Sequence, residues 1–164
     1  MAKITEQTER FEDMLEAMNH VVSANADLSV EERNLLSVAY KNTIGSRRTA
    51  WRALSSIEKK EEQKGSKNIA HLRSYKAKVE SELNKYCNEI LSLIDSQLIV
   101  KASNAEAKVF YHKMKGDYYR YISEYTTGSA HDAAGEKAHE AYKAATDIAE
   151  KDLKTTHPIR LGLA

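Results

Sequence analysis

The sequence predicts an all-α protein built from long amphipathic helices. Its 164 residues include one proline and six glycines, so the residues that most disfavour helix are rare. Apolar residues recur three or four positions apart, the spacing of one helical face, and do not alternate with polar residues as in a strand. A chain of this length fits one domain. We therefore expect residues 1–164 to form a single antiparallel helical bundle.

The N-terminal segment carries apolar residues at helical spacing until polar residues 23–27 interrupt the pattern. This pattern fits either one amphipathic helix or two short ones. Ser29 and Glu32 then have the form of a capping box, which predicts that a second, long helix begins there. Its apolar pattern fades in the charged run 58–65, which Gly65 closes. We expect this run to be a solvated helix end.

Two further helices are expected in the middle of the chain. Over about residues 69–94 the apolar positions resemble an interhelical seam, which requires a partner helix. Ser103 and Asn104 are start signals for the next helix, which we expect to end near Gly128.

The last complete helix is expected from about Ala130 to Leu153, where alanines on one side permit close helix packing. Pro158 suits the first turn of one more helix. We expect Ile159 to Ala164 to begin that helix without room to complete it.

The overall charge argues against a nucleic-acid or membrane partner. The 25 Lys and Arg residues balance 24 Asp and Glu residues, so no global field favours DNA or an acidic membrane. The single cysteine, Cys87, cannot close an intramolecular disulfide and reads as a small buried hydrophobe. No signal peptide or membrane-spanning stretch is evident. We expect a soluble, intracellular protein.

The familiar signatures of enzymes are missing: there is no Gly-rich phosphate loop, His-Glu-x-x-His, Cys-x-x-Cys or Gly-x-Ser-x-Gly. The best candidate metal ligands are Asp132, Glu136 and His139, which helical spacing places on one face. The interleaved Lys137 and Glu140 favour solvated surface instead. We predict no enzymatic activity, no metal and no cofactor.

A stripe of cations is the most informative feature of the second long helix. Lys41 and Arg48 are seven residues apart and so project from one face. Arg52 extends the row by one turn. In the fourth long helix, Asp117 and Glu124 lie within helical reach of an arginine, Arg120, and the Tyr121 hydroxyl lies beside it.

If these two helices are neighbours, Lys41, Arg48, Arg120 and Tyr121 could converge on a dianionic phosphate. Planar guanidinium groups and a hydroxyl donor suit such a ligand. The alternative is that these residues are solvated charges paired with local acids. Spacing alone does not decide between the two.

Longer motifs give a specific resemblance. The stretch Arg33–Asn42 (RNLLSVAYKN), continuing through Gly45–Arg48 and Trp51–Arg52 to Ser55–Glu58, closely resembles the signature of 14-3-3 proteins. The stretches KMKGDYYRY (113–121) and THPIRLGLA (156–164) do so too. The similarity is collinear from about Ala2 to the last residue. It implies an all-helical adaptor that dimerises into a cup and binds phosphoserine or phosphothreonine segments of partner proteins in a basic groove.

The resemblance also implies site residues. Lys41, Arg48, Arg120 and Tyr121 match the phosphate-binding set of the family, and Lys113 matches a groove lysine near the peptide backbone. The helices of about residues 1–99 are implied in dimerisation, and those of about 103–164 in the groove.

The implied dimer interface has a polar and an apolar part, within a homodimer or a heterodimer with related chains. Arg10 and Asp13 match residues that the family pairs across subunits with the positions of Glu82 and Lys78. Apolar residues also fall at family interface positions: Leu54, Ile57 and Tyr75.

The family continues past Ala164 through three more helices, which hold the ligand backbone and line the apolar wall of the groove. We therefore expect an incomplete groove. Two functions follow from the resemblance. One is an adaptor that binds phosphorylated client proteins with reduced affinity. The other is a dimerisation-only fragment that pairs with a full-length homologue without binding ligand. The expected location is the cytoplasm, with the nucleus as a second compartment.

Overall fold

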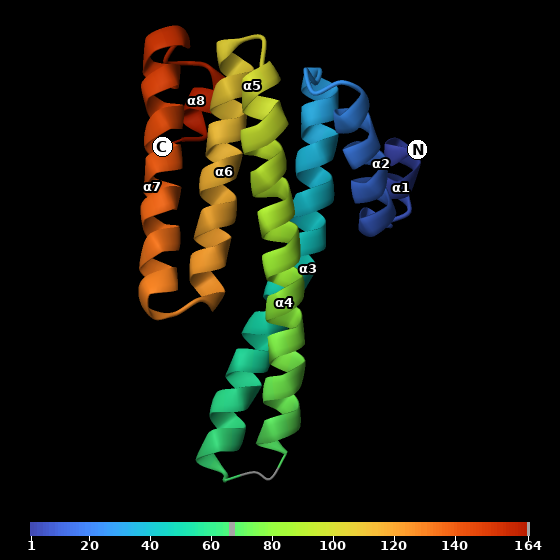
Figure 1. Cartoon of the computed structure of the whole chain (residues 1–164), viewed down its shortest axis with the longest axis vertical. Coiled ribbons are helices and arrows are strands. Elements are labelled where there is room, and N and C mark those ends of the chain that lie inside the picture. The colour runs from blue at the N-terminus through green and yellow to red at the C-terminus, as the bar shows by residue number, and fades with distance from the viewer. Residues whose placement is uncertain (66–67, 164) are drawn as a thin grey trace.

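Long helices dominate the computed structural model, which describes residues 1–65 and 68–163. Within these ranges every regular element is helical, as the sequence predicts. Figure 1 shows α3 (Val30–Gln63) and α4 (Ile69–Leu93) as an antiparallel pair that runs the length of the molecule. The first two helices lie on one side of this pair and the C-terminal helices on the other. The distal halves of α3 and α4 project beyond both groups as a two-helix arm.

The N-terminal segment forms two short helices, α1 (Ala2–Gln7) and α2 (Phe11–Ala24). The second of the two alternatives is therefore correct. Glu9, between them, has a φ of 55°, a left-handed conformation that ends α1 sharply. Four apolar residues of α2 are buried in the main core: Met14, Leu15, Met18 and Val22. The largest fully buried side chains of this core also include Tyr40, Tyr111 and Leu36.

The start of α3 confirms the predicted capping box. The backbone N–H of Glu32 donates to the Ser29 hydroxyl at 3.2 Å, and the Glu32 carboxylate accepts from the Ser29 N–H at 2.8 Å. Two N–H groups that lack partners within the helix are thereby satisfied. The helix ends at Gln63, close to Gly65, whose φ of 63° suits glycine.

Replacing Ser29 by alanine removes one half of this box. We expect the free energy of unfolding to fall by about 1 kcal/mol, because an N-cap side chain contributes that much to a helix start. Urea unfolding followed by circular dichroism measures the change. A Ser56→Ala variant in the exposed interior of α3 is the control, and an equal loss in both variants would contradict a capping role.

The seam predicted over residues 69–94 finds its partner in α3. The chain does not leave the helical path at Ile94. One π-helical segment, η1 (Ile94–Leu98), leads into α5 (Ile99–Lys101), and both Ile94 and Leu98 are buried. Cys87 in α4 is also buried, and this burial raises the pKa of its thiol to about 12, so it behaves as a small hydrophobe.

The C-terminal half is a tight helical pair, α6 (Ala105–Tyr125) and α7 (Gly128–Asp152), followed by α8 (Pro158–Leu161). Asn104 caps α6 by accepting from the Ala107 N–H at 2.8 Å. The small side chains of α7 that face inward are all buried: Ala134, Ala138, Ala141, Ala145 and Ala149.

Pro158 opens the final short helix as predicted. Ala164, the end of the expected last helix, lies outside the described residues. Among the residues that the structure describes, no helix is at once long and apolar enough to cross a membrane.

Candidate functional site

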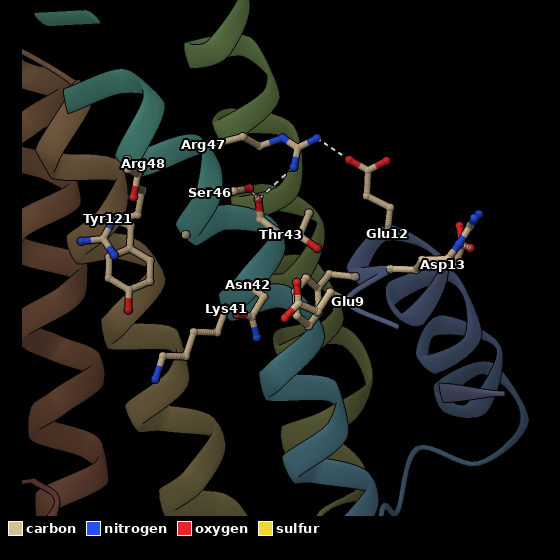
Figure 2. Close-up of a pocket in the computed structure, with 14 residues that line it drawn as sticks. Glu9, Glu12, Asp13, Lys41, Asn42, Thr43, Ser46, Arg47, Arg48 and Tyr121 are labelled. Carbon is tan, nitrogen blue, oxygen red and sulfur yellow. Dashed lines mark hydrogen bonds and ion pairs between the residues drawn. The ribbon is translucent and has the colours of Figure 1, made fainter. Parts of the chain in front are cut away.

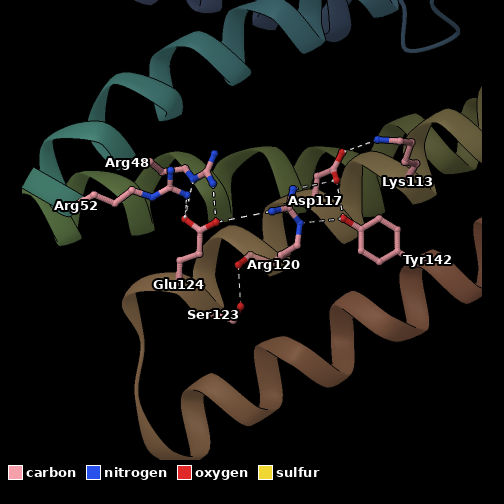
Figure 3. Close-up of polar contacts among 8 residues, drawn as sticks. All are labelled: Arg48, Arg52, Lys113, Asp117, Arg120, Ser123, Glu124 and Tyr142. Atoms are coloured by element: carbon pink, nitrogen blue, oxygen red, sulfur yellow. Dashed lines mark hydrogen bonds and ion pairs between the residues drawn. The ribbon is translucent and has the colours of Figure 1, made fainter. Parts of the chain in front are cut away.

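The candidate site lies where α3 faces α6, and a carboxylate of α6 is its organising group. Glu124 accepts hydrogen bonds from Arg48 through both oxygens, with the Nε–Oε2 contact at 3.0 Å. The Nη2 group of Arg52 also donates to Glu124, at 3.1 Å. Figure 3 shows the two arginines of α3 reaching across to this carboxylate. Glu124 therefore connects the two helices and fixes the direction of Arg48.

The ring of Tyr121 is shared by two guanidinium groups. The central carbon of Arg48 lies 3.8 Å from the ring centroid, and that of Arg120 lies 4.8 Å from it. Both distances are within the range of a cation–π contact. Two arginines from different helices thus lie against one tyrosine, although their charges repel each other.

A second carboxylate, Asp117, lies two turns before Glu124 along α6. It accepts from Lys113 Nζ at 3.0 Å and from the Tyr142 hydroxyl at 2.6 Å. Arg120 lies between the two carboxylates, with nitrogen–oxygen distances of 3.6 Å to Asp117 and 3.8 Å to Glu124. These are longer than the Arg48–Glu124 contacts, so Arg120 keeps N–H groups available for another acceptor.

Two cavities open beside these residues. The larger, about 790 Å³, lies between α2 and α3 and is lined by Lys41, Arg48 and Tyr121 together with residues of the α1–α2 region. Figure 2 shows the Lys41 amine and the Tyr121 hydroxyl pointing to the same side. A smaller cavity, about 80 Å³, is lined by Lys41 and Tyr121 again, with Lys113 and Asp117 from α6.

The structure therefore brings together the residues that the sequence proposed for a phosphate site. Arg48 and Arg120 both contact Tyr121, and Lys41 and Lys113 line a cavity with Tyr121. The alternative interpretation is also partly correct, because both arginines are paired with acids. We name the set Lys41, Arg48, Lys113, Arg120 and Tyr121 the cationic cluster.

Sequence reasoning missed Tyr142, which reaches the site from α7. Its contact with Asp117 depends on how α6 packs against α7. Helical spacing within one segment does not show how two helices pack. A weak signal was present. A tyrosine interrupts the small-residue face of α7, and a glycine at position 116 of the facing helix leaves room for a ring.

The candidate metal ligands Asp132, Glu136 and His139 are exposed on α7. Within residues 1–65 and 68–163, no three His, Cys, Asp or Glu side chains form a metal-binding group. The geometry thus gives no support to a metal at this position.

The residues expected at a dimer interface lie at the start of α2 and along α3 and α4. Ile57 is 47% exposed and Tyr75 57% exposed, while Leu54 packs partly against the core.

The charged residues expected at the interface have contacts within this chain. Arg10 is paired with Asp13 of its own chain. Two further residues expected at the interface are Lys78, which is exposed, and Glu82, which accepts from Arg47 at 2.8 Å. Pairing across subunits stays a prediction.

Burial would raise the pKa of the Glu124 carboxyl, but hydrogen bonds and charge from Arg48, together with Arg52, outweigh it, and the net pKa is lowered from its ordinary 4.5. A carboxylate with a depressed pKa stabilises the folded state above its unfolded pKa. That stabilisation is lost as the pH falls through the folded pKa.

A Glu124→Gln variant tests this linkage. At pH 7 we expect it to be less stable than the unmodified chain by on the order of 1 kcal/mol, because the arginines lose their counter-charge. The difference should shrink as the pH drops below about 4.5. Urea unfolding at a series of pH values measures it, and a difference that is constant down to pH 3 would contradict the assignment.

Comparison with known proteins adds an independent finding. A family model described as 14-3-3 protein matches residues 1–164. The 14-3-3 family protein artA of Aspergillus flavus is 55% identical over 165 residues, which cover all of this chain and 69% of that relative.

Relatives from other organisms give similar values. Protein BMH2 of Saccharomyces cerevisiae is 55% identical over 166 residues, with 61% of its length covered. The 14-3-3-like protein GF14 epsilon of Arabidopsis thaliana is 54% identical over 165 residues, with 65% of its length covered. The chain thus spans 61% to 69% of the length of these relatives.

Proposed function

Because this chain belongs to the 14-3-3 family, we propose that it is a non-enzymatic adaptor that binds partner proteins through phosphoserine or phosphothreonine. The observation that carries the proposal is the pair of guanidinium groups, from two helices, held against the ring of Tyr121. Glu124 contacts Arg48 and lies 3.8 Å from Arg120, so its single negative charge offsets the repulsion between the two guanidinium groups only in part. A dianionic phosphate between them would offset the remainder.

The charges of the cationic cluster suit such a ligand. Lys41, Arg48, Lys113 and Arg120 contribute four positive charges, and Asp117 and Glu124 contribute two negative ones. Arg52, which also donates to Glu124, adds a fifth positive charge, so these side chains together have a net charge of +3. This positive excess favours a dianionic phosphate monoester. The chain as a whole carries only +1, so this attraction is local.

Glu124 orders Arg48 without using all its donors. It occupies the Nε and Nη2 groups, and a guanidinium has five N–H donors in total. The Nη1 group of Arg48 remains for a phosphate oxygen. Tyr121 adds a hydroxyl, and Lys41 adds an ammonium on the same side of the site (Figure 2). We propose that Lys113, which lines the smaller cavity, contacts the backbone of the bound segment.

We also propose that the arm formed by α3 and α4 contributes to a dimer, with a second copy or with a related chain. Ile57 and Tyr75 expose large apolar surfaces, which an interface core would cover. Leu54 belongs to the same apolar part. The polar rim would comprise the charged residues named above: Arg10, Asp13, Lys78 and Glu82.

A second candidate function is a dimerisation module that binds no ligand. The observation that favours it is that Arg48 and Arg120 already have carboxylate neighbours, so a phosphate must compete with Glu124 and Asp117. In this case the chain would pair with a longer relative and leave ligand binding to that subunit.

Fluorescence anisotropy separates the two functions. A labelled Arg-Ser-x-phosphoSer-x-Pro peptide and its unphosphorylated twin are titrated with the chain, and light scattering reports its mass. The adaptor proposal predicts binding of the phosphorylated peptide at least 10-fold tighter than that of its twin. Equal binding of both peptides by a folded dimer would contradict it and favour the dimerisation module.

A further inference from the structure

We propose that Tyr142 of α7 is a positioning residue that directs the Arg120 side chain into the cationic cluster. The inference rests on the proposed phosphate-binding function and adds a third helix to the site. Tyr142 itself lines neither of the two cavities beside the cationic cluster. Its role is to hold Arg120, acting together with Asp117.

The contacts of Tyr142 form a closed triangle, which Figure 3 shows. Its hydroxyl donates to Asp117 Oδ1 at 2.6 Å and accepts from Arg120 Nε at 3.4 Å. Arg120 Nη2 lies 3.6 Å from the same Asp117 oxygen. One edge of the guanidinium therefore faces the α7 side. The opposite Nη1 group is directed toward Glu124 Oε1, the oxygen that also accepts from Arg48, and we propose that phosphate binds on this side.

The hydroxyl is suited to this role at neutral pH. Burial and the hydrogen bond to Asp117 raise the pKa of Tyr142 to about 12. The group thus stays protonated, which lets it donate to the carboxylate while its lone pairs accept from the arginine.

Packing fixes the ring as well as its hydroxyl. A Cβ atom added at Gly116 would lie 2.7 Å from two carbons of the Tyr142 ring, closer than real Cβ atoms approach. The ring therefore lies directly against the backbone of α6. Glycine inside a helix costs about 1 kcal/mol of helix stability relative to alanine. Its presence at position 116 has a physical reason, because the methyl group of an alanine would collide with the Tyr142 ring. Tyr142 is thus held by three residues of α6: its ring packs on Gly116, and its hydroxyl bonds to Asp117 and Arg120.

Positioning matters because Arg120 is the more exposed of the two arginines. Its side chain is 49% exposed, against 18% for Arg48. A long arginine side chain loses considerable rotamer entropy when it is held in one direction. If the free protein already holds it, phosphate binding does not have to bear that cost.

The test is a Tyr142→Phe variant, with Tyr119→Phe as the matched control. Tyr119 lies on the α6 face toward Lys137 and so loses a hydroxyl away from the cluster. We expect the Kd for the phosphopeptide to rise about 3- to 10-fold in Tyr142→Phe, the effect of one hydrogen bond. The control should stay within 2-fold. In an Arg120→Ala background the same substitution should have no further effect, which a general structural defect would not reproduce.

A second readout does not depend on the phosphopeptide. The ¹⁵N–¹H signal of Arg120 Nε, assigned by its loss in Arg120→Ala, reports the mobility of the guanidinium in the free protein. We expect the heteronuclear NOE of this signal to fall in Tyr142→Phe and to be unchanged in Tyr119→Phe. A Gly116→Ala variant, which displaces the Tyr142 ring without removing its hydroxyl, should also lower the heteronuclear NOE of Arg120 Nε.

The outcomes separate the two proposals. Unchanged Arg120 mobility in both Tyr142→Phe and Gly116→Ala would overturn the positioning role, irrespective of the Kd measured for the phosphopeptide. Loss of Arg120 order in a chain that does not distinguish the phosphorylated peptide from its twin would support the positioning role and overturn the proposed function instead.

Discussion

The Arg48→Glu variant is expected to raise the Kd for a phosphopeptide at least about 100-fold. The substitution removes charge-assisted hydrogen bonds to phosphate, each of which contributes about 1.5–3 kcal/mol. It also places a new carboxylate next to Glu124 and close to the phosphate. Since 100-fold corresponds to about 2.7 kcal/mol, loss of the bonds together with the repulsion exceeds this value. Anisotropy titration with the labelled peptide measures the effect.

Lys143→Glu is the matched control for this variant. It changes the net charge by the same amount, at an exposed site on α7 where Lys143 pairs only with Asp147 among the contacts described. We expect its Kd to stay within 2-fold. Equal losses in the two variants would show that overall charge, and not the cationic cluster, governs binding. Urea unfolding of both variants checks that Arg48→Glu remains folded.

The Ile57→Asp variant is expected to convert a dimer into a monomer. Ile57 is 47% exposed on the arm, and an unpaired charge buried in an apolar interface costs about 2–5 kcal/mol. The Kd of self-association should therefore rise about 30-fold or more. Size-exclusion light scattering over a dilution series measures the mass of the particle.

Gln63→Glu supplies the control for the arm. It introduces the same charge at an exposed position six residues further along α3, which helical geometry turns to another side. We expect this variant to dimerise normally. A dimer that persists in Ile57→Asp would contradict the interface proposed for the arm. Because the cationic cluster lies within one chain, the Ile57→Asp monomer should still prefer the phosphorylated peptide.

The helices could be predicted because their signals are local. The capping box of Ser29 and Glu32, the cap at Asn104 and the alanine face of α7 each lie within one helix. The break between α1 and α2 was left open, since the polar run 23–27 lies after α2 and the real break falls at Glu9. No local pattern marks a single left-handed residue there.

The candidate site was predictable only in part, for the same physical reason. Helical spacing placed Asp117 and Glu124 beside Arg120 within α6. It could not show that Glu124 takes its strongest contacts from Arg48 of α3, 76 residues away in sequence. The contribution of Tyr142 depends likewise on packing between helices. The long-range contacts that complete the site follow from the fold and not from the spacing.

The most direct test of phosphate recognition observes the phosphate itself. The ³¹P signal of a phosphoserine peptide is followed against pH, alone and with saturating protein. The second pKa of free phosphoserine is about 6, and a cluster with net positive charge favours the dianion. We predict that this pKa falls to about 5 or below in the complex, and that it stays near 6 with the Arg48→Glu variant. An unchanged pKa with the unmodified chain would contradict the account.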